Sequence, residues 1–244
     1  MSLAARLMNV FATPGDVFED VKNSAPSTAN WVVPVSLFGI VSAISVVIIF
    51  SQPAVVQKTL EPREKMIEQQ ANAGKISRES ADKQIEVLEK YGPLILKITG
   101  GVGAVCMSFI LLFGWAFVFW LLGRFFLKSS LNYMKLAEML GLASAISVLQ
   151  QIIKMLLVVS FSNPMASPSL AMLLKNPDPQ NKLFMLLSAL DVLTIWVLAV
   201  RSIGLAKLAN VSFARAAVLV FASWWVLFGL MLVVTSAFQA AFGR

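Results

Sequence analysis

Long apolar stretches alternate with short polar segments along the 244 residues of this chain. Each stretch reaches the roughly 20 apolar residues that an α-helix needs to cross a hydrocarbon core of about 30 Å. The pattern therefore predicts an all-α membrane protein, a bundle of five transmembrane helices in one membrane domain, 31–244. The five expected spans are 31–51, 94–123, 136–159, 183–208 and 213–242.

The polar segment between the first two spans, 52–92, is the longest of the connecting segments. It holds seven basic and seven acidic residues, so it is neutral overall. Gly74 separates two helix-forming stretches, and Ala81, Ile85 and Leu88 recur at helical spacing in the second. This predicts an extramembrane helical hairpin inserted in the membrane domain. The hairpin is either a docking arm for another protein or only a solvated connector.

The segment that precedes the first span, 1–30, combines two short amphipathic stretches with a turn-rich connector. Leu3, Leu7 and Phe11 share one helical face, and Thr13-Pro14 has the sequence of a helix start. We expect an N-terminal amphipathic segment that lies on the membrane surface. The alternative is that its apolar faces dock on the protein's own loops.

Composition supports the membrane assignment and narrows the chemistry. Charged residues are 14% of the chain, against about 25% in an average soluble domain. Histidine is absent and Cys106 is the only cysteine, which removes Ser–His and Cys–His catalysis, imidazole metal sites and intramolecular disulfides. We therefore expect no enzyme activity, no metal and no cofactor.

The net charge of +7 fits cationic loops that face an anionic lipid leaflet. No basic run with interleaved aromatic residues is present, so a nucleic-acid partner is not expected. Short loops govern topology, and they place the N-terminus in the cytoplasm, with the hairpin and the C-terminus outside. Counting the seven basic residues of the hairpin would reverse this balance. The basic residues on the N-terminal side are Arg6, Lys22, Arg124, Lys128, Lys135, Arg201, Lys207 and Arg215.

Ionisable residues inside the spans are candidates for function, because a charge in hydrocarbon is costly. Lys97, Lys154 and Asp191 lie at similar depth in the predicted topology and form a candidate intramembrane polar cluster. The specific expectation is a Lys154–Asp191 ion pair. Such a pair fixes helix register or serves transport or proton relay. Alternatively, Lys154 extends to the outer interface.

A second group of charges is expected at the cytoplasmic ends of the spans. Glu138 at the start of the third span has Lys135 close by, and Arg201 and Arg215 within reach. We interpret these four residues as an interfacial charge network.

Small residues in the second and third spans allow helices to approach closely. The helix-packing candidates are Gly100, Gly101, Ala104, Gly141 and Ser144.

Several short motifs together resemble a known family. They are Phe11-x-x-Pro14-x-x-x-Phe18, Trp31-x-x-Pro34, Tyr133 with Lys135-Leu-Ala, Asp191-x-x-x-x-Trp196, Gly204-Leu-Ala and Ser212-Phe-Ala-Arg-Ala. The chain is similar to the bacterial branch of the Yip family, the Ypt/Rab-interacting membrane proteins. The resemblance implies a five-helix bundle with a cytoplasmic N-terminus in the bacterial cytoplasmic (inner) membrane. Eukaryotic relatives are associated with vesicle trafficking, Rab-type GTPase interaction and membrane shaping.

Two functions follow from these observations. The first is a non-catalytic membrane protein that binds or organises other membrane components, with the bilayer and other membrane proteins as partners. The second is a transporter subunit for a small solute, ion or lipid, with a polar pocket around Asp191. A transporter with five spans would need to form a homo-oligomer. Transport predicts a broken helix and a polar path at Asp191, whereas partner binding predicts a plugged bundle.

Overall fold

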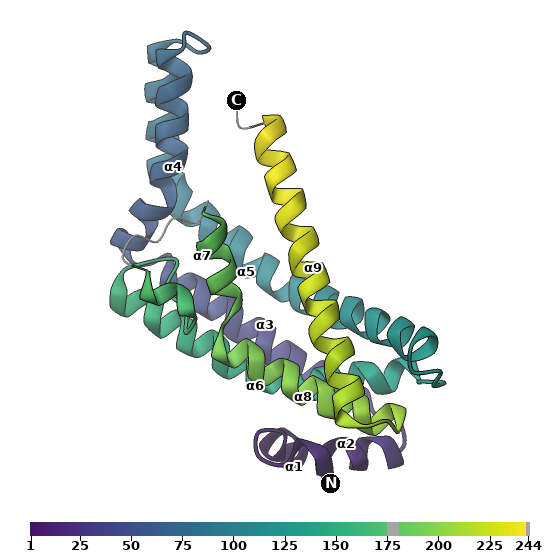
Figure 1. Cartoon of the computed structure of the whole chain (residues 1–244). Coiled ribbons are helices and arrows are strands. Elements are labelled where there is room, and N and C mark those ends of the chain that lie inside the picture. Colours follow the sequence, from purple (N-terminus) through teal and green to yellow (C-terminus); the bar gives the residue numbers. More distant parts are fainter. Residues whose placement is uncertain (175–180, 243–244) are drawn as a thin grey trace. The chain divides into compact units, whose positions relative to one another are not determined.

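A computed structural model of the chain describes residues 1–174 and 181–242, with side chains described up to residue 237. The described residues form helices joined by short connections (Figure 1). The elements are α1 (Leu3–Asn9), α2 (Pro14–Asn23), α3 (Ala29–Ile49), α4 (Pro53–Asn72), α5 (Arg78–Phe125), α6 (Tyr133–Phe161), the short 3-10 helix η1 (Leu170–Leu173), α7 (Lys182–Ala189), α8 (Val192–Ala209) and α9 (Phe213–Phe242).

Five of the described helices are long and apolar enough to cross a membrane. The shortest of them, α8, has 18 residues and would span about 27 Å at 1.5 Å per residue. The predicted all-helical membrane bundle with five spans is therefore confirmed. The five segments are Ala29–Ile49, Arg78–Phe125, Tyr133–Phe161, Val192–Ala209 and Phe213–Ala237.

The fourth apolar stretch is not one helix, and the prediction of a continuous span over 183–208 is wrong. α7 ends at Ala189, and α8 begins only at Val192. Between them, the Leu190 carbonyl accepts from the amide of Leu170 and the amide of Val192 donates to Pro168, both at 3.3 Å. These bonds hold the chain extended at the break, so the helix cannot continue through it.

The segment 52–92 forms α4 and the first turns of α5. The chain reverses at Gly74, whose φ of +69° lies in the left-handed region that glycine tolerates best. Leu60 of α4 then packs against Gly92 of α5, where an added Cβ would lie 3.0 Å from a Leu60 methyl group. α4 and the start of α5 therefore lie side by side and antiparallel (Figure 1). We call this pair the arm.

Contacts between Cα atoms divide the chain into two compact units. The first unit comprises Met1–Val35, Ile110–Ala145 and Trp196–Arg244, and the second comprises Ser36–Phe109 and Ile146–Ile195.

In the first unit, the apolar face of α2 is buried against other parts of the protein. Val17, Phe18 and Val21 of α2 are fully buried, and Phe18 contacts the position of Gly204 on α8. Asp20 pairs with Arg6 at 2.7 Å and with the terminal ammonium group at 3.0 Å, which joins α1 to α2. The apolar side of α2 thus packs against protein and does not insert into lipid.

In the second unit, a small apolar cluster joins the start of α4 to the end of α6. Val55 and Val158 are buried there, together with Ala166 of the following loop. Lys58 donates to the Ser162 carbonyl at 2.8 Å, just past the end of α6. A lysine beside the last carbonyls of a helix is favourable because it meets the negative end of the helix dipole.

Candidate functional site

A polar cavity of about 440 Å³ in the second unit contains two of the three predicted intramembrane charges. α6 and the break between α7 and α8 supply most of its polar lining, and apolar side chains complete it. We call it the Asp191 cavity. It is lined by Phe38, Ser147, Gln150, Gln151, Lys154, Pro164, Met165, Ser167, Phe184, Ser188, Asp191 and Thr194.

Asp191 is the most constrained polar residue of this cavity. Its Oδ1 accepts hydrogen bonds from the backbone amides of Leu193 and Thr194, both at 2.9 Å, so the carboxylate caps α8. The same oxygen accepts from Nε2 of Gln150 at 3.2 Å, and Nε2 also donates to Oγ1 of Thr194 at 2.8 Å. The two protons of the Gln150 amide are thereby used, which leaves its carbonyl oxygen as an acceptor.

The expected Lys154–Asp191 ion pair does not form. Both side chains line the Asp191 cavity, yet within the described residues no nitrogen of Lys154 comes within 4.0 Å of the carboxylate. The backbone amides of Leu193 and Thr194 at the start of α8 instead hold Oδ1. Lys97 lines a different cavity, of about 460 Å³, where α4 meets α5 beside Glu64 and Glu89. The structure therefore brings Lys154 and Asp191 to one cavity without pairing them, and leaves Lys97 out of it.

The first unit contains a buried polar cluster around Glu138. Asn30 donates to Oε2 of Glu138 at 2.5 Å, and both side chains are 1% exposed. Nζ of Lys135 lies 3.3 Å from Oε1, and it also donates to the carbonyls of Val21 and Ser24 at 2.7 and 2.9 Å. The cluster therefore ties α6 to the first turn of α3 and to the end of α2.

Two members of the predicted charge network do not join this cluster. The guanidinium of Arg201 lies 5.7 Å from the ring centre of Trp115, in a cation–π contact. Arg215 is exposed at the start of α9. Among the ion pairs of the described residues, Glu138 pairs with Lys135 and with neither arginine. The network predicted over four residues is thus a pair.

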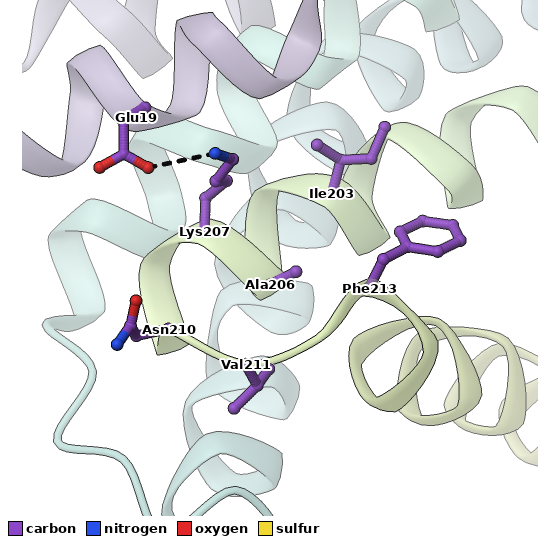
Figure 2. Close-up of a pocket in the computed structure, with 7 residues that line it drawn as sticks. All are labelled: Glu19, Ile203, Ala206, Lys207, Asn210, Val211 and Phe213. Carbon is purple, nitrogen blue, oxygen red and sulfur yellow. Dashed lines mark ion pairs between the residues drawn. The ribbon is translucent and has the colours of Figure 1, made fainter.

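A cavity of about 560 Å³ in the first unit lies between α2 and the turn from α8 to α9. Figure 2 shows Glu19 of α2 and Lys207 of α8 pointing toward one another there, at 3.3 Å. A hydrogen bond from Asn23 is the main cause that holds the pKa of Glu19 below its ordinary value of 4.5, and the interaction with Lys207 is the next. The remaining lining is mostly apolar. The two charged residues of this cavity therefore neutralise each other. It is lined by Glu19, Ile203, Ala206, Lys207, Asn210, Val211 and Phe213.

The predicted helix-packing residues differ in how close their neighbours are. At Gly141 an added Cβ would lie 2.7 Å from Cβ of Trp31, and closer still to its backbone. At Gly100 it would lie 2.9 Å from a Val46 methyl group, and at Gly101 it would meet only Ala43, at 4.0 Å.

Two further candidates carry a side chain beyond the backbone. Ser144 is buried and donates to the carbonyl of Gly141 at 2.6 Å, so its hydroxyl is satisfied within its own helix. Ala104 is half-buried on α5.

Comparison with protein-family sequence models decides the family. The Yip1 domain model matches residues 8–235, nearly the whole chain. The chain belongs to the Yip1 family. Neither the curated proteins nor the solved structures contain a match to it.

The Yip1 domain of this chain holds site residues that the sequence did not single out. Gln150, Gln151 and Thr194 complete the Asp191 cavity, and Asn30 completes the Glu138 cluster. Gln150 lies four residues before Lys154, hence on the same face of α6, and this spacing was a usable signal. The sequence around Asn30 gave no such signal, because its partner Glu138 is 108 positions away in sequence.

Proposed function

We propose that this Yip1-family protein is a non-catalytic integral membrane protein that binds or organises other membrane components, in a membrane-trafficking or assembly role. The observation that carries the proposal is the arm, α4 with the first turns of α5. Met66, Val87 and Tyr91 on the arm are 45–55% exposed, within a segment rich in charge. Contiguous apolar surface rimmed by polar residues is typical of protein-binding surfaces.

A groove along the arm supports this proposal. It has a volume of about 420 Å³, and its lining includes the apolar side chains of Ile67, Val87 and Leu88 together with the basic residues Arg63 and Lys83. The arm's exposed ion pairs, Lys65–Glu61 and Lys83–Glu79, are internal to each helix, at 2.6 Å. An amphipathic helix from another membrane protein is a suitable occupant, because apolar grooves between helices bind such helices.

We further propose that the protein belongs to the bacterial branch of the family and lies in the cytoplasmic (inner) membrane. The N-terminus is then cytoplasmic and the C-terminus outside, as the charges of the short loops favour. Self-association through the same arm would give a homo-oligomer.

The test is a pull-down from detergent-solubilised membranes. Wild type is compared with a chain whose arm is shortened and with the double variant Ile67→Glu, Val87→Glu, both positions being in the lining of the groove. We expect both variants to lose the membrane proteins that copurify with wild type, because a charge in the groove opposes an apolar partner. The control is Glu68→Gln, on the same helix. Retention of every partner by the variants would refute the arm as a docking surface.

A second candidate function, a transporter subunit, is favoured by one observation. The fourth apolar stretch is broken at Asp191, and a polar cavity lies at the break. Broken helices are typical of substrate sites in transporters. The test is a single cysteine at Thr194 in a Cys106→Ser background, labelled by a membrane-impermeant thiol reagent. Labelling from both sides supports a transport pathway, whereas protection from both sides excludes one.

A further inference from the structure

Two opposite charges line the Asp191 cavity and do not meet. We propose that this cavity binds a small zwitterion, a group that carries an ammonium and an anion a few atoms apart. An aminophospholipid headgroup and a free amino acid both have this chemistry. The proposal follows from which hydrogen-bonding atoms the protein leaves available at each end of the cavity.

The Asp191 end would hold the ammonium. Only Oδ1 of the carboxylate is engaged by the described residues, in three hydrogen bonds. The other oxygen and the carbonyl of Gln150 remain as acceptors beside it. Asp191 is only 7% exposed, and a buried carboxylate without a cation is unfavourable. A ligand ammonium would supply the missing positive charge and donate to these acceptors.

The Lys154 end would hold the anion. Lys154 has no ion pair among the described residues, although it lines a cavity that contains a carboxylate. Gln151 lines the cavity from the same helix and adds an amide donor. An ammonium and an amide beside each other bind a phosphate or carboxylate group through charge-assisted hydrogen bonds.

The pair of charges selects against simpler ligands. A bare cation at Asp191 would be repelled by Lys154, and a bare anion at Lys154 would be repelled by Asp191. Only a ligand with both charges gains at both ends.

Size and lining agree with a zwitterion. About 440 Å³ lies within the range of small-molecule sites, roughly 300–1,000 Å³. Phe38, Met165 and Phe184 give the cavity an apolar side that suits the carbon atoms of a ligand.

This inference is independent of the arm. It deepens the second candidate function by naming a ligand class for the Asp191 cavity. Only the step after binding, transport of the bound zwitterion, rests on that function. Binding is therefore measured in equilibrium, without flux. A protein that binds the zwitterion and does not transport it would refute the transporter and leave the site standing.

The experiment uses the full chain in two settings. In detergent, titration calorimetry measures binding of O-phosphoethanolamine, the soluble headgroup, and of glycine, a free amino acid. In nanodiscs, native mass spectrometry measures retention of phosphatidylethanolamine against phosphatidylglycerol, which lacks the ammonium. Selective retention of phosphatidylethanolamine without glycine binding identifies a lipid headgroup, and glycine binding without lipid selectivity identifies a free amino acid. Either result supports the zwitterion site.

Three variants test the named residues. Asp191→Asn keeps a helix-capping side chain and removes the charge. Lys154→Gln alters an exposed side chain, so both variants should fold. Each should weaken zwitterion binding by about tenfold or more, the loss of one charge-assisted hydrogen bond. Lys97→Gln, in the other cavity, should leave affinity within about twofold of wild type.

Two outcomes would overturn the proposal. One is a wild-type protein that binds neither soluble probe and does not prefer phosphatidylethanolamine. The other is binding that survives both Asp191→Asn and Lys154→Gln. If Asp191→Asn fails to fold, Gln150→Glu replaces it, because an added carboxylate on the ammonium side should raise affinity for O-phosphoethanolamine. No such rise would then count against the assignment.

Discussion

Glu138 and Asp191 are both buried carboxylates in apolar surroundings, and the structure uses them differently. In the first unit, Oε2 of Glu138 accepts a hydrogen bond from Asn30, and Oε1 lies 3.3 Å from the ammonium of Lys135, in an ion pair without a hydrogen bond. In the second unit, the described bonds to Asp191 all reach one oxygen, and the residue borders a cavity. A carboxylate whose partners are all internal stabilises the fold, whereas one with an unused oxygen beside a cavity can bind something else.

The same distinction applies to the two lysines nearby. Lys135 donates to two carbonyls of the N-terminal segment and forms an ion pair with Glu138, so the partners of its ammonium lie within the protein. Lys154 has no ion-pair partner among the described residues and is exposed to its cavity. Removing a group from the first unit should therefore change stability, and removing one from the second should change binding.

The largest effect is expected from Glu138→Ala. The change leaves Asn30 and Lys135 without their partner in a buried place, which should cost about 3 kcal/mol of unfolding free energy. Thermal unfolding in detergent, followed by tryptophan fluorescence, measures it. The matched control is Glu61→Ala on the exposed arm, where the loss should stay within about 0.5 kcal/mol. Equal losses in the two variants would contradict a structural role for Glu138.

Gly141→Ala should have the next largest effect, a loss of about 2 kcal/mol in unfolding free energy. A methyl group there would collide with Cβ and backbone atoms of Trp31, and backbone cannot move aside cheaply. The control is Gly103→Ala on α5, which has no neighbour within 4 Å. That control should be neutral or stabilising by up to about 1 kcal/mol. A Gly141→Ala protein as stable as wild type would show that α3 and α6 do not approach as described.

Asp191 should matter less for stability than Glu138. Asp191→Ala removes the cap of α8 and should cost about 1 kcal/mol, while Asp191→Asn keeps a capping side chain and should cost a few tenths. Chemical denaturation of the two variants in the same detergent compares them. A loss in Asp191→Asn as large as that in Glu138→Ala would remove the contrast between the two carboxylates.

The smallest effect is a pH dependence at the N-terminal helices. Asp20 accepts hydrogen bonds from the terminal ammonium group and from Arg6, and these bonds hold its pKa below the ordinary 3.8. The pKa of Glu19 is likewise held below its ordinary 4.5. A lowered pKa in the folded state contributes stability above the unfolded pKa, and this is lost as pH falls through the folded value. Stability should therefore be constant above about pH 5 and decline below pH 4.

The double variant Glu19→Gln, Asp20→Asn should weaken that decline, as thermal midpoints between pH 3 and 7 would show. Glu64→Gln, on the arm, serves as the control. A decline of the same size in all three proteins would assign the acid sensitivity to other groups.

The sequence could predict the spans because lipid allows few alternatives. A run of apolar residues of sufficient length must be helical in hydrocarbon, since every backbone amide has to be bonded within its own segment. The helix break at Asp191 was harder to predict, because neither proline nor glycine marks it. An aspartate just before an apolar stretch is a helix-start signal, but the continuous hydropathy concealed it.

The candidate sites were predictable only in their chemistry. Lys154 and Asp191 were identified as costly charges in apolar surroundings, and the structure places both at one cavity. Their failure to pair depends on the Leu193 and Thr194 amides, which hold the carboxylate from the start of α8. Arg201 was expected to reach Glu138 and instead contacts Trp115. Such choices between partners of similar chemistry depend on distances that sequence spacing does not define.

The sequence alone determined that this protein crosses a membrane with five helices. It also determined that the chain has no histidine and only one cysteine, so that no intramolecular disulfide can form. Both follow from the hydropathy and the identity of the residues, which do not depend on where a residue lies in the fold. The tertiary structure decided which polar groups neutralise one another and which remain available in a cavity. That outcome depends on packing, because a hydrogen bond needs its two atoms within about 3.5 Å and helices approach only as closely as their side chains allow.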